Sequence, residues 1–221
     1  AKLNKKHHAE IGDPEIQTTI AQQEMAFRMQ ASVPELADIS DEPKAILDMY
    51  GPEVHKPGSY ARNCLLARRM AERDVRFVQL FHRGWDHHSR LPDNMRGQCR
   101  DVDQPTAALL KDLKARGLLD DTLVVWMGEF GRTPKINANK SRDHWPQCYS
   151  ALLAGGGVKG GYVHGASDST GAYPSRDPVR PDDLAATVFQ LMGIDPATEV
   201  YDTQDRPLVI AEGEAITELI A

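Results

Sequence analysis

The sequence has little cysteine, little positive charge and no long apolar run, and each shortage excludes a class of protein. Its three cysteines, Cys64, Cys99 and Cys148, are scattered and form no C-x-x-C pair. This pattern argues against a disulfide framework and against a thiolate zinc site. No apolar run approaches the roughly 20 residues that a membrane-spanning helix needs, so we expect no membrane insertion. No signal segment is visible either, so we expect a mature or truncated product.

Positive charge is outweighed by negative charge. The chain carries 26 lysines and arginines against 32 aspartates and glutamates, which gives a formal net charge of −6. A nucleic-acid-binding surface needs clustered Lys and Arg, so we expect no nucleic-acid polymer as a partner. A small anionic substrate remains compatible with this composition, because it needs only a local positive site.

The N-terminal part is expected to be helical. Residues 1–14 are polar and basic and predict a flexible arm, in which the pair His7 and His8 belongs to a solvated terminus. The rest, 15–221, is expected to form a single domain, which suits a chain of 221 residues. Its helical N-terminal part covers 15–58. A first helix is predicted from Pro14, with Asp13 as its N-cap and a break at Pro34. A second helix is predicted over 42–49 and a linker over 51–58.

Three apolar runs predict buried strands, at 75–81, 122–127 and 149–154. Further helices are predicted over 59–74, with Arg62, Arg68, Arg69 and Arg73 on its wet face, over 103–117, over 181–192, and in a short stretch after Gly213. Alternating strands and helices favour an α/β fold with a mostly parallel sheet that is covered on both faces.

Polar side chains follow these predicted strands at the points where the strands end. Asp86 and His88 come after the first run, and Glu129 comes directly after the second. In parallel sheets the carboxyl ends of the strands converge on the ligand site, so these groups are expected to meet there, joined by His144. Carboxylate oxygen and imidazole nitrogen suit zinc, manganese or iron better than calcium. The alternative is that Asp86 to His88 form a hydrated loop and that His144 lies in a structural turn.

The same loops carry arginines. Arg132 and Arg142 can hold a tetrahedral anion, while the competing interpretation pairs Arg132 with Glu129 in a salt bridge. Lys159, in a Gly-rich turn, is a weaker candidate for contact with an anion. The nearby hydroxyls and aromatic rings, namely Thr133, Ser141, Trp85 and Trp145, are expected in turn and packing roles, and Cys148 in a buried strand.

Several longer stretches resemble a known family. They are A-R-N-C-L-L-A-R-R-M (61–70), V-R-F-V-Q-L (75–80), G-W-D-H-H (84–88), L-L-K-D-L-K-A-R-G-L-L-D-D-T-L-V-V-W-M-G-E-F-G-R-T-P (109–134), R-D-H-W (142–145), A-G-G-G-V-K-G-G (154–161) and D-L-A-A-T-V-F-Q-L-M-G-I-D (183–195). The chain resembles the sulfatase-like domain-of-unknown-function 1501 family, in the alkaline phosphatase and sulfatase superfamily.

That resemblance implies an αβα three-layer sandwich, alkaline-phosphatase-like, with metal-dependent hydrolysis of phosphate or sulfate esters. It implies that Asp86 and His88 match the carboxylate–histidine pair of the superfamily, Glu129 its acidic motif, and His144 its later histidine. Glu129-Phe130 stands where many members show Asp-His, which puts one metal position in doubt.

The resemblance also implies that an earlier segment, which supplies a metal-ligating Asp and the nucleophile, precedes the first residue here, so that the domain is truncated at its N-terminus. An open sheet edge would follow and would favour a homodimer through that edge. Related chains tend to carry an export signal, which implies a periplasmic or secreted location.

We therefore expect a metal-dependent hydrolase that acts on a small anionic ester, with zinc or else manganese as the cofactor. The metal lowers the pKa of a water, which attacks phosphorus or sulfur while Arg132 and Arg142 stabilise the developing charge. Two alternatives stay open. The chain can be a non-catalytic remnant that binds a metal, an anion or a partner chain, or a metal-free promiscuous esterase.

Overall fold

The computed structural model describes residues 14–221, so the predicted flexible arm, the His7–His8 pair and the Asp13 cap lie outside the described residues. The chain divides into two compact units, the first ending at Asp48 and the second spanning Met49–Ala221. The first unit holds α2 (Pro14–Ala37) and most of α3 (Lys44–Tyr50). The predicted break at Pro34 is wrong, because α2 continues through it for one more turn. Proline lacks only the N–H that would donate to the preceding turn, and its carbonyl still accepts a hydrogen bond from the Asp38 amide.

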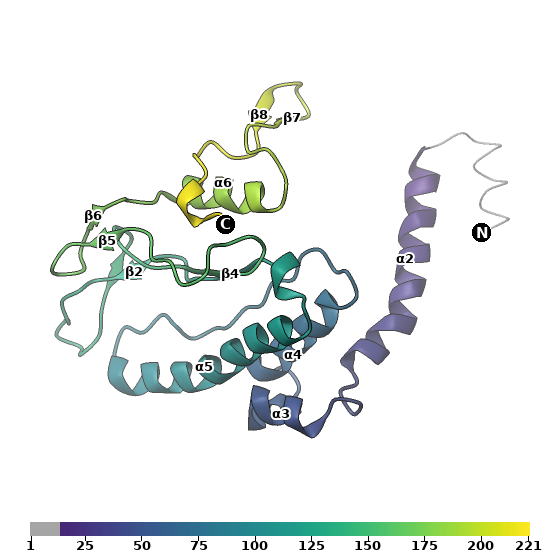
Figure 1. Cartoon of the computed structure of the whole chain (residues 1–221), viewed down its shortest axis with the longest axis horizontal. Helices are drawn as coiled ribbons and strands as arrows, with labels where there is room; N and C mark the ends of the chain where they lie inside the picture. Colours follow the sequence, from purple (N-terminus) through teal and green to yellow (C-terminus); the bar gives the residue numbers. More distant parts are fainter. Residues whose placement is uncertain (1–13) are drawn as a thin grey trace. The chain divides into compact units, whose positions relative to one another are not determined.

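The core of the second unit is a pair of helices, α4 (Tyr60–Ala71) and α5 (Leu91–Ala115), preceded by the short η1 (Pro52–His55) (Figure 1). The helix α4 begins where predicted, because the Ser59 side chain accepts a hydrogen bond from the Arg62 amide and so caps the first turn. Apolar side chains from both helices fill the space between them; they include Cys64, Leu65, Val102, Ala108 and Leu113.

Two arginines of α4 contradict the prediction of a fully wet face. Arg68 and Arg69 are only 2% and 3% exposed. The Arg68 guanidinium lies 2.9 Å from the carboxylate of Asp112 on α5, which is itself buried and also accepts a hydrogen bond from the Tyr50 hydroxyl. Burial and the neighbouring Asp112 raise the pKa of Tyr50, so the phenol stays protonated and keeps donating. A charged cluster therefore lies inside the helix pair.

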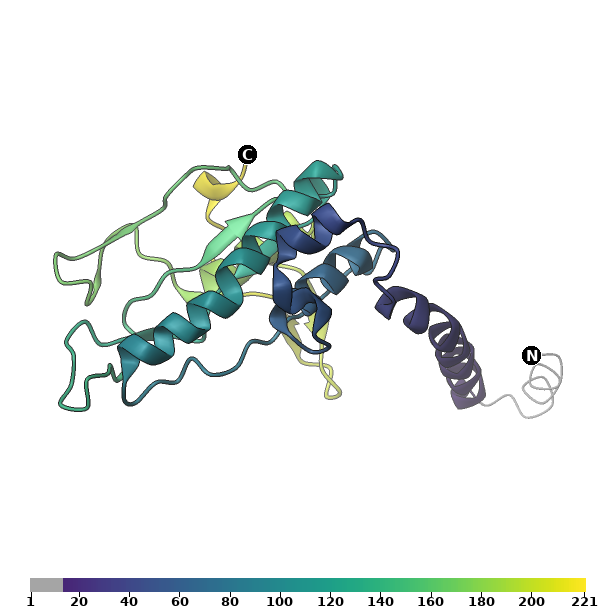
Figure 2. The same ribbon diagram turned by 90° about the horizontal axis from the view of Figure 1, so that it is seen from below.

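The helix α5 starts 12 residues before its predicted start at Asp103, at Leu91, with Pro92 in its first turn and Pro105 inside it. The prediction took Pro105 as the helix start, but Pro92 is the proline that occupies a first-turn position, where its missing N–H costs nothing. This difference matters for the site, because it places the residues after His88 at a helix N-terminus. Figure 2 shows the long α5 running across the second unit.

The predicted mostly parallel, αβα three-layer sandwich is wrong. The strands of residues 14–221 form four separate two-stranded antiparallel sheets. Their members pair as β1 (Val124–Trp126) with β4 (Leu152–Ala154), β2 (Gly131–Arg132) with β3 (His144–Trp145), β5 (Ala166–Ser167) with β6 (Pro174–Arg176), and β7 (Glu199–Tyr201) with β8 (Pro207–Val209). The predicted strands at 122–127 and 149–154 are present as the three-residue strands β1 and β4, and they pair antiparallel instead of parallel.

The predicted strand at 75–81 is wrong as well. The segment joins no sheet within the described part of the chain, and Phe77 and Phe81 are 73% and 80% exposed. Alternating apolar residues favour an extended backbone, but a strand also needs a neighbour with which to share hydrogen bonds, and a sequence pattern cannot supply one. The predicted homodimer through an open edge stays a prediction.

The short η2 (Leu119–Asp121) directly follows α5. The C-terminal region holds α6 (Pro181–Leu191), which matches the predicted helix closely, and the short η3 (Thr217–Leu219). Among residues 14–221, no helix is both long enough and apolar enough to cross a bilayer. The exported location stays a prediction of the resemblance.

We expect the variant Asp112→Asn to lose about 3 kcal/mol of unfolding free energy, because it removes the buried carboxylate and leaves the buried Arg68 charge with Glu72 as its acidic partner. Urea denaturation followed by far-UV circular dichroism measures this loss. Lys56→Ala is the control, since it removes one partner of an exposed pair with Glu53 and should cost less than about 1 kcal/mol. Equal midpoints for the two variants would contradict the role of the buried pair.

Candidate metal centre

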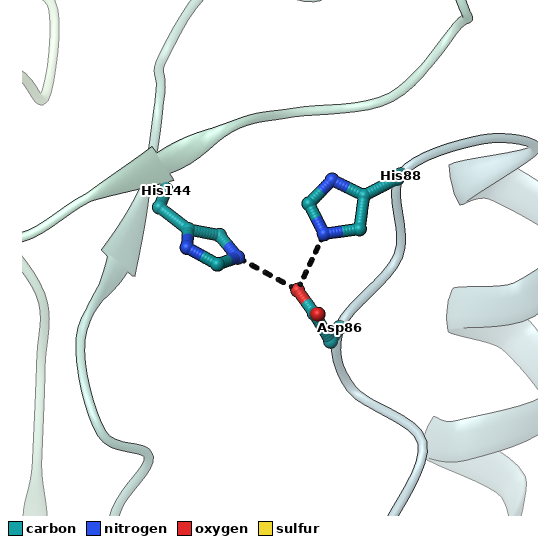
Figure 3. Close-up of side chains that lie close together, drawn as sticks. All are labelled: Asp86, His88 and His144. Atoms are coloured by element: carbon teal, nitrogen blue, oxygen red, sulfur yellow. Dashed lines mark hydrogen bonds and ion pairs between the residues drawn. The ribbon is translucent and has the colours of Figure 1, made fainter.

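The site begins with the loop between α4 and α5. This loop belongs to no helix or strand, and the His87 amide donates to the Trp85 carbonyl, which makes a tight three-residue turn centred on Asp86. The Asp86 carboxylate and the His88 imidazole face each other (Figure 3), whereas His87 between them is buried. Gly84, with a φ of 98°, turns the chain just before these residues, in a backbone conformation that disfavours other residues.

The second half of the site is the hairpin of β2 and β3. Arg132 and His144 are directly opposite each other across this antiparallel pair, so both side chains lie on one face. The connecting loop is tied by Asn137, whose side-chain oxygen accepts from the Ser141 amide and whose amide group donates to Asp143. This tied loop holds the imidazole of His144 toward Asp86, as Figure 3 shows.

One oxygen of Asp86 is the meeting point. Its Oδ1 lies 3.0 Å from Nε2 of His88, 2.8 Å from Nε2 of His144 and 2.8 Å from a guanidinium nitrogen of Arg132. One ligand atom from each of Asp86, His88 and His144 lies within 4.8 Å of the other two. The two imidazole rings are 5.2 Å apart, and Phe130 packs 4.7 Å from the His144 ring. Groups separated by more than 50 positions therefore converge on one point.

The site is open to solvent. The side chains of Asp86, His88 and His144 are 58%, 57% and 47% exposed, whereas Arg132 is 20% exposed. The hydrogen bond with His144, followed by those with Arg132 and His88, holds the pKa of the Asp86 carboxyl well below its usual range. Asp86 is therefore an anion at any pH at which an imidazole is neutral enough to bind a metal.

Of the other predicted site residues, Glu129 lies near this cluster and Lys159 does not. Glu129 lies beside the cluster, where one of its oxygens is 3.9 Å from Arg132, the partner of the alternative salt bridge. It is outside the group of three ligand atoms that meet. Lys159 lies elsewhere: its ammonium group donates to the Glu218 carbonyl and lies over the ring of Tyr162.

The hydroxyls and the tryptophans near the site have structural partners. The Thr133 hydroxyl donates to the Lys135 carbonyl, and the Ser141 hydroxyl donates to the His87 carbonyl. Indole N–H groups of Trp85 and Trp145 donate to His82 and to the Ala172 carbonyl, respectively. Each hydroxyl is engaged in holding a turn or a loop.

Arg142 lines a pocket of about 450 Å³ next to the cluster, together with Arg132. Its walls also contain His87 and Arg96, two residues that the sequence analysis did not single out. A signal for Arg96 was present in the sequence: Pro92 marks the true start of α5, and a helix that begins there places Arg96 in its second turn.

The donor set suits a divalent transition metal. One carboxylate and two imidazoles form a three-ligand set that catalytic zinc sites use, with a further position left for water or substrate. The ligand atoms of a tetrahedral zinc site lie roughly 3.3 Å apart, given bonds of about 2.0–2.1 Å. Asp86 Oδ1 lies 2.8 Å and 3.0 Å from the two imidazole nitrogens, so small side-chain rotations that open these contacts would admit the ion.

We expect the carboxyl of Asp86 in metal-free protein to titrate below its ordinary range, and His144→Ala to raise its pKa more than Arg132→Gln does. The stability that Asp86 contributes should be complete above its unfolded pKa and be lost only as the pH falls through the lower folded value. A carbon-13 NMR titration of the carboxyl groups measures both effects. Lys135→Gln, which removes an exposed charge of the same hairpin loop, should leave Asp86 unchanged. A carboxyl of Asp86 that titrates in its usual range would contradict the geometry.

Comparisons with known proteins give one match. A family model described as "Protein of unknown function (DUF1501)" matches residues 1–220. No curated protein and no solved structure matches the chain. Since the family model covers almost the whole chain, this protein belongs to the DUF1501 family of proteins of unknown function.

Proposed function

We propose that this chain binds a divalent metal ion, with zinc as the best fit and manganese as the second, and hydrolyses phosphate or sulfate esters. The observation that carries the proposal is the convergence of Asp86, His88 and His144 from two separate segments. An exposed carboxylate and two imidazoles contribute little stability to the fold, so we propose ligand binding as the reason for their convergence. Kinship with the sulfatase and alkaline phosphatase superfamily is part of this proposal.

The chain's own residues have distinct tasks in this proposal. Asp86 and the two histidines hold the ion, and Arg132 changes partner: once the Asp86 oxygen faces a cation, its guanidinium can turn to a bound ester. Arg142 lies on the same pocket and supplies a second guanidinium for the anionic group. Glu129 is proposed as a further oxygen donor, which requires its side chain to rotate away from Arg132.

A bound divalent ion supplies Lewis-acid chemistry, because it lowers the pKa of a coordinated water and stabilises charge on the ester. The two hydroxyls that the sequence analysis considered near the cluster, those of Thr133 and Ser141, both donate to backbone carbonyls. Water is therefore the proposed attacking group, and the two arginines are proposed to stabilise the charge that develops on the equatorial oxygens.

The test combines metal analysis with a substrate screen. We expect the purified chain to bind about one zinc ion through its three ligands and to hydrolyse an aryl phosphate or sulfate. Treatment with a chelator should abolish this activity, and zinc or manganese should restore it. Hydrolysis that survives chelation would instead support the metal-free esterase, and metal binding without turnover of any ester would support the binding remnant.

His88→Ala should lose metal stoichiometry and rate together, because two remaining ligands hold the ion too weakly. The matched control is His55→Ala, which removes an exposed histidine of η1 outside the cluster and should retain both. Elemental analysis after dialysis and initial-rate assays measure the two quantities. Unchanged metal content in His88→Ala would refute its assigned role.

A further inference from the structure

The pocket of about 450 Å³ next to the metal cluster is lined by two kinds of side chain. Four are polar or cationic, namely His87, Arg96, Arg132 and Arg142, and four are largely apolar, namely Trp85, Leu91, Pro92 and Met95. Arg132 connects the pocket to the metal cluster, since one of its guanidinium nitrogens also reaches Asp86. A small ligand in this pocket would therefore lie directly against the proposed metal ligands.

Three arginines line this one pocket although the chain has a net charge of −6. None of the residues found to line the pocket, all within the described part of the chain, is acidic. The nearest acidic partners lie outside the lining: Asp86 pairs with Arg132, and Asp93 lies 3.6 Å from Arg96 in an exposed pair. The pocket also lies at the N-terminus of the 25-residue α5, whose dipole favours an anion. The first backbone amides of α5 already donate to the carbonyls of Lys140 and Arg90. An anion in the pocket would therefore accept hydrogen bonds from the guanidinium groups.

His87 points to a ligand independently of the arginines. It is 8% exposed, and its Nε2 is buried without a hydrogen-bond partner in the described structure. A buried polar atom without a partner costs free energy, so such atoms are rare unless a ligand or water satisfies them. The backbone around His87 is held in place, because its carbonyl accepts a hydrogen bond from the buried Ser141 hydroxyl. The unpaired Nε2 thus belongs to a buried residue that lines the pocket and whose backbone is held in place.

We infer that this pocket is the ester-binding subsite, and that it selects compact monoester anions with a flat apolar group, such as an aryl phosphate or aryl sulfate. The inference rests on the proposed function for its choice of phosphate or sulfate as the anionic group. Arg96, Arg142 and His87 bind the anion, while Trp85 and Met95 contact the ring. The volume falls in the lower part of the usual range of about 300–1,000 Å³ for small-molecule sites, which suits a compact ester.

Isothermal titration calorimetry with phenyl phosphate and metal-free protein, dialysed free of chelator, tests binding at the subsite without turnover. We expect phenyl phosphate to bind at least roughly tenfold more tightly than inorganic phosphate or phenol. Only phenyl phosphate has both an anionic group for the arginines and a ring for the apolar side chains. Equal affinity for phenyl phosphate and inorganic phosphate would overturn the apolar half of the inference, and absence of phenyl phosphate binding would overturn all of it.

Two variants test the individual contacts. His87→Leu should weaken phenyl phosphate binding at least roughly fivefold while the melting temperature stays constant or rises, because the change removes an unsatisfied buried atom. Arg96→Gln should weaken binding similarly, and it is safe for folding because Arg96 is exposed. Arg100→Gln, an exposed arginine of α5 that does not line the pocket, is the matched control and should bind like the parent chain. Parent-like affinity in both His87→Leu and Arg96→Gln would refute the assignment.

The outcome separates this inference from the metal proposal. Phenyl phosphate binding that depends on His87 and Arg96, in a chain that binds no zinc, would keep the subsite and refute the metal centre. Zinc binding that depends on His88, in a chain that does not bind phenyl phosphate, would keep the metal centre and refute the subsite.

Discussion

The buried ion pair between Arg68 and Asp112 holds α4 against α5, and the candidate site depends on that contact. Both charges are almost completely buried, and the Tyr50 hydroxyl and the Arg116 guanidinium complete the partners of the Asp112 carboxylate. The segment that connects the two helices carries Asp86, His87 and His88. The β2–β3 hairpin carries His144 and Arg132, so the site joins the connection between two packed helices to a short antiparallel hairpin.

Within that connection, neighbouring residues lie in two different environments. Asp86 and His88 point to the β2–β3 hairpin, where His144 and Arg132 complete the cluster. His87 between them is buried and lines the pocket. Three consecutive residues can thus serve a metal and an anion at once, and Arg132, which reaches both, is the physical link between them.

The residues with site chemistry could be recognised from the sequence far better than the fold that presents them. Asp86, His88 and His144 stand out because carboxylate and imidazole groups follow apolar segments, and the structure brings these three side chains together. The strand at 75–81 and the parallel sheet failed for one reason: alternating apolar residues indicate an extended backbone, but they do not name the segment that pairs with it. The start of α4 was predicted correctly because Ser59 caps it. The start of α5 was predicted wrongly because two prolines, Pro92 and Pro105, both suit a first-turn position.

By itself, the sequence determined the chemical inventory and the local signals: few cysteines, an acidic net charge, helix caps, and a histidine-rich segment flanked by arginines. Only the tertiary structure decided that the strands pair in short antiparallel hairpins, that Arg68 is buried, and that His87 faces a pocket while its neighbours face a cluster. Local signals act over a few residues of one segment and can be read along the chain. Burial, strand partners and the meeting of side chains from distant segments depend on contacts that exist only after the chain has folded.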